Sequence, residues 1–109
     1  MEIINFEEFK KLDMRIGIIK TAEKKEGSEK LLVLNIEIGE ETRQILSGIA
    51  KFYSPEELIG KRVLVLCNLA PRMIMGLESQ GMLLCAVDKE DKVALLNPDK
   101  EFPSGTIIT

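Results

Sequence analysis

Along most of this chain, stretches in which apolar and polar residues alternate are interspersed with short apolar runs. Both patterns are typical of β-strands. Clusters of glycine, proline, asparagine and charged residues separate these stretches and predict turns. Gly17 interrupts the first stretch and predicts a bend or bulge there. The pattern predicts strands over Met14–Lys20, Lys30–Ile38, Thr42–Ser47, Arg62–Cys67, Gly81–Val87, Lys92–Leu96 and Thr106–Ile108.

Capping residues predict two short helices. The segment Asn5–Leu12 opens with an N-cap asparagine, and a glutamate follows three positions later, as in a capping box. The segment Ser54–Gly60 opens with a serine and then a proline at the first helical position. A glutamate completes its capping box, and a glycine ends it. We therefore expect one short helix before the first strand and one between the third and fourth strands.

The order of these elements predicts an all-β fold. Three strands, a short helix and two further strands follow one another in the five-stranded OB-fold, a Greek-key barrel. A barrel also suits a strand-rich chain because closure removes exposed sheet edges. We expect a five-stranded OB-fold barrel with an N-terminal helix and a C-terminal strand extension. The chain has no internal repeat or linker, so we expect a single domain over residues 1–109.

A long loop, Asn68–Gln80, separates the fourth and fifth predicted strands. Loops of this length without structure of their own are uncommon in compact domains and are often functional. In an OB-fold this loop and the loop between the first two strands, here Glu23–Glu29, flank the ligand face. The sequence thus predicts a binding surface at this loop, with a plain strand connector as the alternative. The polar residues clustered in the loop are Asn68, Arg72, Glu78, Ser79 and Gln80.

Charge and hydropathy narrow the class of protein. The 109 residues include 18 acidic and 15 basic residues, for a net charge of −3, which argues against indiscriminate coating of nucleic acids. Basic residues are denser in the middle of the chain, which permits a local positive face. No apolar run approaches the roughly 18 residues of a membrane-spanning helix, and Met1–Asn5 lacks the features of a secretory signal. We expect a soluble, cytoplasmic protein without a membrane partner.

The cysteine and histidine content disfavours metal sites and catalysis. The chain has no histidine and two cysteines, Cys67 and Cys85, each within an apolar run. A structural zinc site needs four ligands, usually Cys and His, so none is expected. Catalytic pairs of Ser or Cys with His are excluded. We expect free thiols in the core rather than a disulfide, no cofactor, and no catalytic constellation.

Aromatic residues are few, and none lies on the first three predicted strands. Proteins that bind generic single strands stack successive bases on several aromatic side chains. Their absence favours a folded RNA, which is bound mostly through its backbone and hydroxyl groups.

Six spaced motifs stand in order along the chain, namely Phe9–Gly17, Lys30–Leu34, Arg43–Ile49, Pro55–Lys61, Asn68–Arg72 and Ser79–Met82. Together they closely resemble the tRNA-binding domain at the C-terminus of bacterial methionyl-tRNA synthetases. The same domain occurs as a free-standing structure-specific tRNA-binding protein and in the endothelial-monocyte-activating polypeptide. A chain of this length is most similar to the free-standing β subunit of a methionyl-tRNA synthetase.

This resemblance implies a non-catalytic OB-fold module that binds tRNA by shape and forms a homodimer. The N-terminal helix and the C-terminal strands are implied to lie near the dimer contact. The module would assist the methionyl-tRNA synthetase catalytic chain, in trans or as a β subunit. A protein-interaction module, cytokine-like or scaffolding, that docks another protein is the alternative.

The resemblance also implies the residues that contact tRNA. They are Lys30, Asn68, Arg72, Ser79 and Met82, with Arg43 as an addition.

The chemistry of these residues leaves alternatives open. Lys30 and Arg72 can neutralise phosphates, or can be ordinary solvated charges. Arg43 is equally suited to an ion pair with Glu37 or Glu41 across a hairpin. Met82 precedes an apolar run and is equally suited to core packing.

Overall fold

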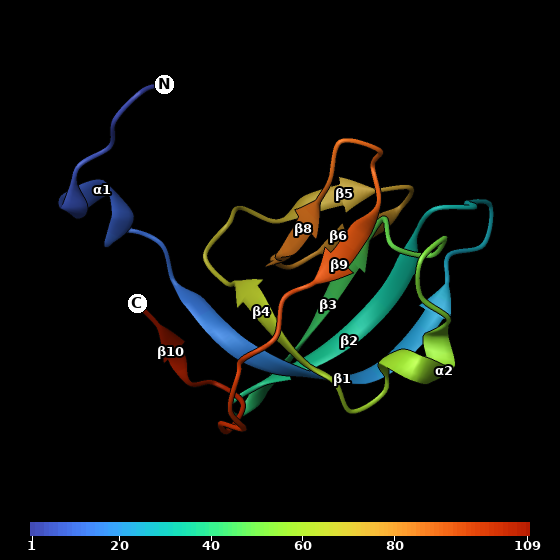
Figure 1. Ribbon diagram of the computed structural model, residues 1–109. Coiled ribbons are helices and arrows are strands. Elements are labelled where there is room, and N and C mark those ends of the chain that lie inside the picture. Colours follow the sequence, from blue (N-terminus) through green and yellow to red (C-terminus); the bar gives the residue numbers. More distant parts are fainter.

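The computed structural model describes residues 1–109, and its main element is a curled, six-stranded antiparallel sheet that forms a half-barrel (Figure 1). The strand order is β3-β2-β1-β4-β7, and β10 pairs with β1 beside this path. The strands of this sheet are β1 (Met14–Lys24), β2 (Leu32–Ile38), β3 (Glu41–Ser47), β4 (Arg62–Leu66), β7 (Met82–Leu83) and β10 (Ile107–Ile108).

Two hairpins and two helices complete the fold. The hairpins are β5 (Arg72–Ile74) with β6 (Leu77–Ser79), and β8 (Cys85–Val87) with β9 (Val93–Leu95). The helices are α1 (Phe6–Phe9) and α2 (Pro55–Leu58). Neither helix is long enough to cross a membrane.

The core lies inside the curl of the sheet. Ile19, Leu34 and Ile36 from β1 and β2 are fully buried, and Leu58 of α2 packs into the same cluster. Burying each such aliphatic side chain contributes about 1.5 to 3 kcal/mol, so this cluster dominates the stability of the domain. The two cysteines are free thiols, as predicted, with Cys67 buried and Cys85 half-buried. Burial raises the pKa of both thiols.

The predicted all-β fold is confirmed, and so are both capping boxes. In α1 the side chain of Asn5 accepts a hydrogen bond from the Glu8 N–H at 2.9 Å. Before α2 the Glu57 carboxylate accepts from the Ser54 N–H at 2.8 Å. This bond and the one from the Ser54 hydroxyl lower the pKa of Glu57.

The predicted role of Gly17 is wrong. The irregularity in β1 falls at Lys20, between Ile19 and Thr21, and β1 continues to Lys24. Gly17 instead allows β1 and β2 to approach closely. A Cβ atom on Gly17 would lie 2.5 Å from Cγ2 of the buried Ile36.

The loop between the first two strands lies two residues later than predicted, over residues 25–31. Because β1 runs on to Lys24 and β2 starts at Leu32, Lys30 precedes β2 instead of opening it. The loop is closed by a backbone hydrogen bond from the Lys25 N–H to the Leu31 carbonyl at 3.0 Å. The Ser28 hydroxyl accepts from the Lys30 and Leu31 N–H groups, each at 3.2 Å.

The segment Asn68–Gln80 is not the irregular loop expected from the sequence, because β5 and β6 form a hairpin within it. The turn consists of Met75 and Gly76, with φ of 47° and 85°. Two-residue hairpin turns with positive φ match the twist of the flanking strands. The hairpin gives this segment a defined shape.

The predicted fifth strand, Gly81–Val87, is two strands. β7 pairs with β4, while β8 leaves the sheet and pairs with β9. The apolar run continues through both strands because each is partly buried, β7 beside β4 and β8 beside β9.

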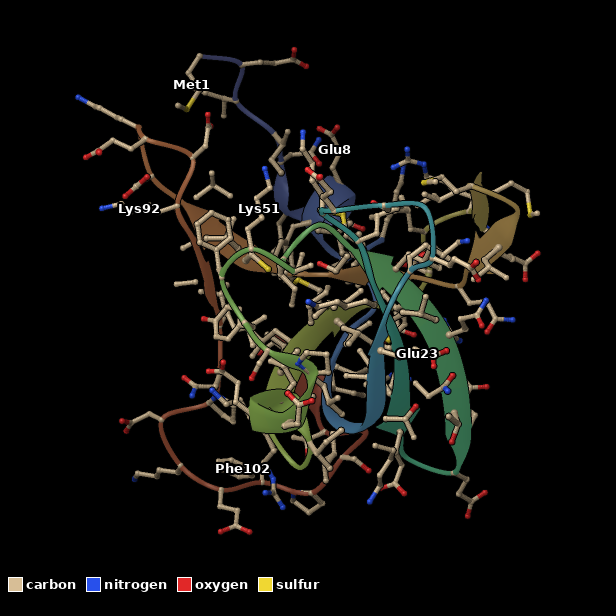
Figure 2. All side chains as sticks on the ribbon, turned by 90° about the vertical axis from the view of Figure 1, so that its right-hand side faces the viewer. Met1, Glu8, Glu23, Lys51, Lys92 and Phe102 are labelled. Carbon is tan, nitrogen blue, oxygen red and sulfur yellow. The ribbon has the colours of Figure 1, made fainter.

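The N-terminal segment stands clear of the sheet (Figure 1), and Met1 projects beyond the rest of the fold (Figure 2). None of the α1 residues is buried, and the side chains of Ile3 and Phe6 are 92% and 67% exposed. An apolar segment with so little cover is a surface suited to a partner.

Candidate functional site

A cavity of about 270 Å³ lies where the end of β3 meets the β5–β6 hairpin and β7. We call it the Arg72 hollow. Its wall is largely apolar and includes Leu31, Leu46, Leu69 and Ile74. The structure brings three of the predicted site residues together around it, namely Arg72, Ser79 and Met82.

Arg72 and Lys30 are the two predicted residues whose charges are free. Both side chains are exposed, and no carboxylate lies within 4.0 Å of either. Arg72 opens β5 and lines the hollow, while Lys30 precedes Leu31, which also lines it. These cations are therefore available to an anionic ligand.

Ser79 is unsuited to the predicted ligand contact. Its side chain is buried, with 5% exposure. Its hydroxyl accepts a hydrogen bond from the Leu46 N–H at 3.0 Å and donates one to the Gly81 carbonyl at 3.1 Å. The bond with Leu46 holds the hairpin against β3, and the bond with Gly81 orients the Ser79 side chain, so Ser79 shapes the hollow from within.

Met82 is half exposed, at 48%, and lines the Arg72 hollow. The core-packing alternative is therefore wrong for its side chain. A methionine in this place gives the hollow a flexible apolar wall.

A second hollow, of about 540 Å³, lies on the other side of Leu69 and Ala70 and contains Arg43 and Asn68. We call it the Arg43 hollow. The two hollows share Leu69 and Ala70. Five of the six predicted site residues therefore line adjoining hollows, and Lys30 lies beside the first.

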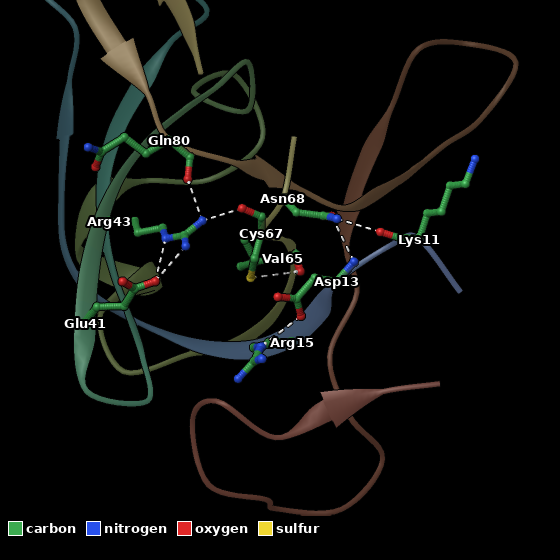
Figure 3. Close-up of polar contacts among 9 residues, drawn as sticks. All are labelled: Lys11, Asp13, Arg15, Glu41, Arg43, Val65, Cys67, Asn68 and Gln80. Atoms are coloured by element: carbon green, nitrogen blue, oxygen red, sulfur yellow. Dashed lines mark hydrogen bonds and ion pairs between the residues drawn. The ribbon is translucent and has the colours of Figure 1, made fainter. Parts of the chain in front are cut away.

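The guanidinium of Arg43 is occupied by contacts within the protein (Figure 3). It pairs with the Glu41 carboxylate at 2.6 Å, so the ion-pair alternative is confirmed with Glu41. It also donates to the Cys67 carbonyl and, at 3.4 Å, to the Gln80 carbonyl. Arg43 thus joins β3 to the ends of the segment that carries the hairpin. Glu37, the other partner considered, pairs with Lys20 at 3.7 Å.

The amide of Asn68 is also occupied (Figure 3). Its Oδ1 accepts from the Asp13 N–H at 2.9 Å, and its Nδ2 donates to the Lys11 carbonyl at 2.5 Å. Asp13 in turn accepts from Arg15 at 2.8 Å, which raises the pKa of Arg15. Asn68 therefore fixes the start of β1 against the end of β4.

Two features of the site carry no signal in the sequence. Gln44 on β3 exchanges hydrogen bonds with Gln80, and its side chain donates to the Glu78 carbonyl at 2.9 Å. The tips of two loops also meet, since a Cβ on Gly27 would lie 3.7 Å from Cε of Met75. Both contacts join segments far apart in the chain, so periodicity cannot reveal them.

The arrangement provides free cations beside an apolar hollow on a rigid frame. No group of three or more His, Cys, Asp or Glu residues is placed to hold a metal ion. What the site can do chemically is bind an anionic ligand that also presents an apolar or planar face.

Comparison with known proteins gives the family. The family model described as "Putative tRNA binding domain" matches residues 14–107. The methionine–tRNA ligase of Caldanaerobacter subterraneus is 51% identical over 109 residues, which are 100% of this chain and 17% of the ligase. The ligase of Archaeoglobus fulgidus is 55% identical over 105 residues, which are 96% of this chain and 16% of the ligase. This chain therefore spans about a sixth of these curated relatives.

Two solved structures resemble the fold along nearly its whole length. The MetRS related protein from Pyrococcus horikoshii has a TM-score of 0.94 and 40% identity, with 100% of both chains covered. The chaperone CsaA from Bacillus anthracis has a TM-score of 0.90 and 36% identity, with 99% of this chain and 100% of that chain covered. The family match and these free-standing neighbours indicate a non-catalytic binding module. The chain belongs to the tRNA-binding domain family.

Proposed function

We propose that this domain binds folded tRNA at the Arg72 hollow, by shape and backbone contacts, and that it assists a methionyl-tRNA synthetase. The observation that carries the proposal is the pair of unpaired cations, Arg72 and Lys30, beside the hollow. Each can neutralise a phosphate, and Arg72 can instead stack its guanidinium plane on an exposed base.

The other predicted residues take different parts in this proposal. Met82 supplies apolar contact from the wall of the hollow, where its side chain is half exposed. Arg43, Asn68 and Ser79 act indirectly, because their polar groups are bonded to the protein and hold the hairpin and strand ends in place. The contact set is therefore Lys30, Arg72 and Met82, and the positioning set is the other three.

The partnership with the synthetase rests on the relatives. The same domain forms part of methionine–tRNA ligases, and the Pyrococcus horikoshii neighbour matches it over its whole chain. A module that holds tRNA beside a cytoplasmic catalytic chain raises the local tRNA concentration, whether bound as a β subunit or acting in trans.

Homodimer formation is supported by the uncovered apolar surface at one end of the molecule. Ile3, Ile4 and Phe6 precede β1, and Ile107 pairs beside its first residues in β10. All four side chains are more than half exposed. A second copy that covers this surface would remove it from water and double the number of tRNA contacts.

The test is a binding titration of the purified protein with tRNA, a folded RNA of similar size and single-stranded RNA, at two salt concentrations. We expect preferential binding of tRNA, with an affinity that falls steeply as salt rises. No RNA binding at low salt would contradict the proposal.

A second function, docking of an apolar protein segment, is favoured by one observation. Met82, at 48% exposure, lines the Arg72 hollow, and Met73 and Met75, at 68% and 52% exposure, lie on the adjoining β5–β6 hairpin. Methionine-rich surfaces adapt to varied apolar partners, and the Bacillus anthracis neighbour is described as a chaperone. Displacement of a bound apolar peptide by tRNA would show that both ligands use this hollow. Salt-insensitive peptide binding in a protein that binds no tRNA would make docking the main function.

A further inference from the structure

Another hollow, of about 620 Å³, lies where the end of β1 meets the segment between β3 and α2. We call it the Phe52 hollow. Glu23 and Lys24 of β1 line one side, and Lys51 and Phe52 line the other. Ala22, which is small, also lines it and leaves room for a ligand.

The hollow has one free aromatic face. The Phe52 side chain is 42% exposed. Its neighbour Tyr53 is fixed, because its hydroxyl accepts from the Leu95 N–H at 3.0 Å and its ring lies 5.3 Å from the Lys61 ammonium. Phe52 therefore offers a ring next to a rigid wall. An exposed ring of this kind is what an unstacked RNA base rests on.

The charges of the hollow suit the rest of a nucleotide. Lys24 and Lys51 are exposed, and no carboxylate lies within 4.0 Å of either ammonium. They are free to contact a phosphate. Glu23 and Glu56 line the same hollow, and their carboxylates accept hydrogen bonds only. They would favour bases with amino groups, which are adenine, cytosine and guanine.

The backbone joins this hollow to the proposed tRNA surface. The Ala50 N–H donates to the Lys30 carbonyl at 2.9 Å. The Phe52 and Tyr53 N–H groups both donate to the Ile49 carbonyl, at 3.0 and 3.1 Å. The segment that carries Phe52 is thus held in place and is attached directly to Lys30, so one RNA can reach both regions.

We propose that the Phe52 hollow binds a single unstacked nucleotide of the tRNA. The base stacks on the Phe52 ring, and the adjoining phosphate lies between Lys24 and Lys51. This inference rests on the proposed function, because the nucleotide is supplied by the bound tRNA.

The first experiment tests the hollow without tRNA. Isotope-labelled protein is titrated with GMP, UMP and ribose 5-phosphate and followed by NMR. We expect GMP to shift the amide signals of Lys51 and Phe52, and to do so more than UMP or ribose 5-phosphate. Equal shifts with ribose 5-phosphate, or shifts confined to other residues, would overturn the proposal.

The second experiment measures tRNA affinity in variants. Phe52→Leu keeps an apolar side chain but removes the stacking face, so we expect about tenfold weaker binding with an unchanged salt slope. Lys51→Gln should instead lower the salt slope by about 0.7 to 0.9. Phe52→Trp should bind as the wild type does. Melting curves of all variants should match that of the wild type.

Phe102→Leu is the matched control, because the Phe102 side chain is 47% exposed and lies far from Lys51 (Figure 2). It should leave tRNA affinity unchanged, and Phe52→Leu should not weaken binding of a fully paired RNA duplex. If Phe52→Leu bound tRNA as tightly as the wild type does, the nucleotide site at the Phe52 hollow would be overturned, while the proposed tRNA-binding function would stand. A wild-type protein that binds no tRNA would overturn the proposed function, and the GMP titration would still decide the hollow.

Discussion

The buried hydroxyl of Ser79 accepts a hydrogen bond from the backbone N–H of Leu46 at 3.0 Å, where one edge of the sheet meets the segment before β7. No strand pairing joins β3 to β7. The contact between β3 and the segment before β7, which we call the seam, is made by the Ser79 side chain together with the hydrogen bonds between Gln44 and Gln80. The Ser79 hydroxyl is thus one of several groups that hold in place the hairpin that carries Arg72.

We expect Ser79→Ala to lower the free energy of unfolding by about 1 to 3 kcal/mol, because it leaves the Leu46 N–H buried without a partner. Urea unfolding measures the change. Ser47→Ala is the control, since the Ser47 hydroxyl makes no hydrogen bond in the structure. Equal stability of both variants would mean that the seam does not depend on Ser79.

Arg72→Ala should weaken tRNA binding and reduce its salt slope by about 0.7 to 0.9, because one phosphate contact is lost. Lys30→Ala should behave in the same way. Both side chains are exposed, so the melting temperature should not change. Lys89→Ala, on the turn between β8 and β9, is a charge-matched control that should bind normally. A fall in melting temperature with either variant would instead show a structural role.

Gly17→Ala should destabilise the domain by about 1 to 3 kcal/mol, because the new Cβ would overlap the buried Ile36 side chain between β1 and β2. Gly48→Ala is the control, because a Cβ there would meet no atom within 4 Å. Thermal unfolding of the two variants gives the comparison. If the two variants had the same melting temperature, the close approach of β1 and β2 would not be the reason for a glycine at position 17.

Glu57 should make a pH-dependent contribution to stability. Its pKa is lowered from the ordinary value of 4.5 by hydrogen bonds from Ser54. The folded state therefore binds this proton less tightly than the unfolded chain does. The contribution is present above pH 4.5 and is lost as the pH falls through the folded pKa.

The measurement is the melting temperature of the wild type and Glu57→Gln from pH 7 to pH 3. We expect the wild type to be more stable at pH 7 and the difference to shrink below pH 4.5. Glu56→Gln, on the same helix, serves as control because Glu56 accepts no hydrogen bond. A difference that stayed constant with pH would exclude the capping carboxylate as its source.

Phe6→Ser should shift a dimer toward monomer, because the exposed Phe6 side chain belongs to the apolar surface proposed to meet a second copy. Sedimentation equilibrium over a range of concentrations measures the shift. Met73→Ser removes a side chain of similar exposure, 68% against 67%, from the β5–β6 hairpin and should leave the dimer intact. A wild-type protein that stays monomeric at all concentrations would contradict the dimer.

The sequence alone determined the strands β1 to β4, both helices and the family, but not the β5–β6 hairpin or the division of Gly81–Val87 into β7 and β8. Alternation of apolar residues marks the longer strands, and the capping boxes at Asn5 and Ser54 act within a few residues, so local patterns suffice for these elements. The motifs from Phe9 to Met82 carry the family for the same reason, because they are read directly from the order of residues.

Only the tertiary structure decided what each polar residue of the site does. Ser79 and Arg72 stand seven positions apart in one polar cluster, and nothing local distinguishes them. Folding buries Ser79 against Leu46 and leaves Arg72 in solvent. Arg43 and Asn68 likewise find carbonyl partners that lie 24 and 57 positions away along the chain. Hydrogen bonds between such distant groups depend on how the sheet curls, and a one-dimensional pattern does not contain that geometry.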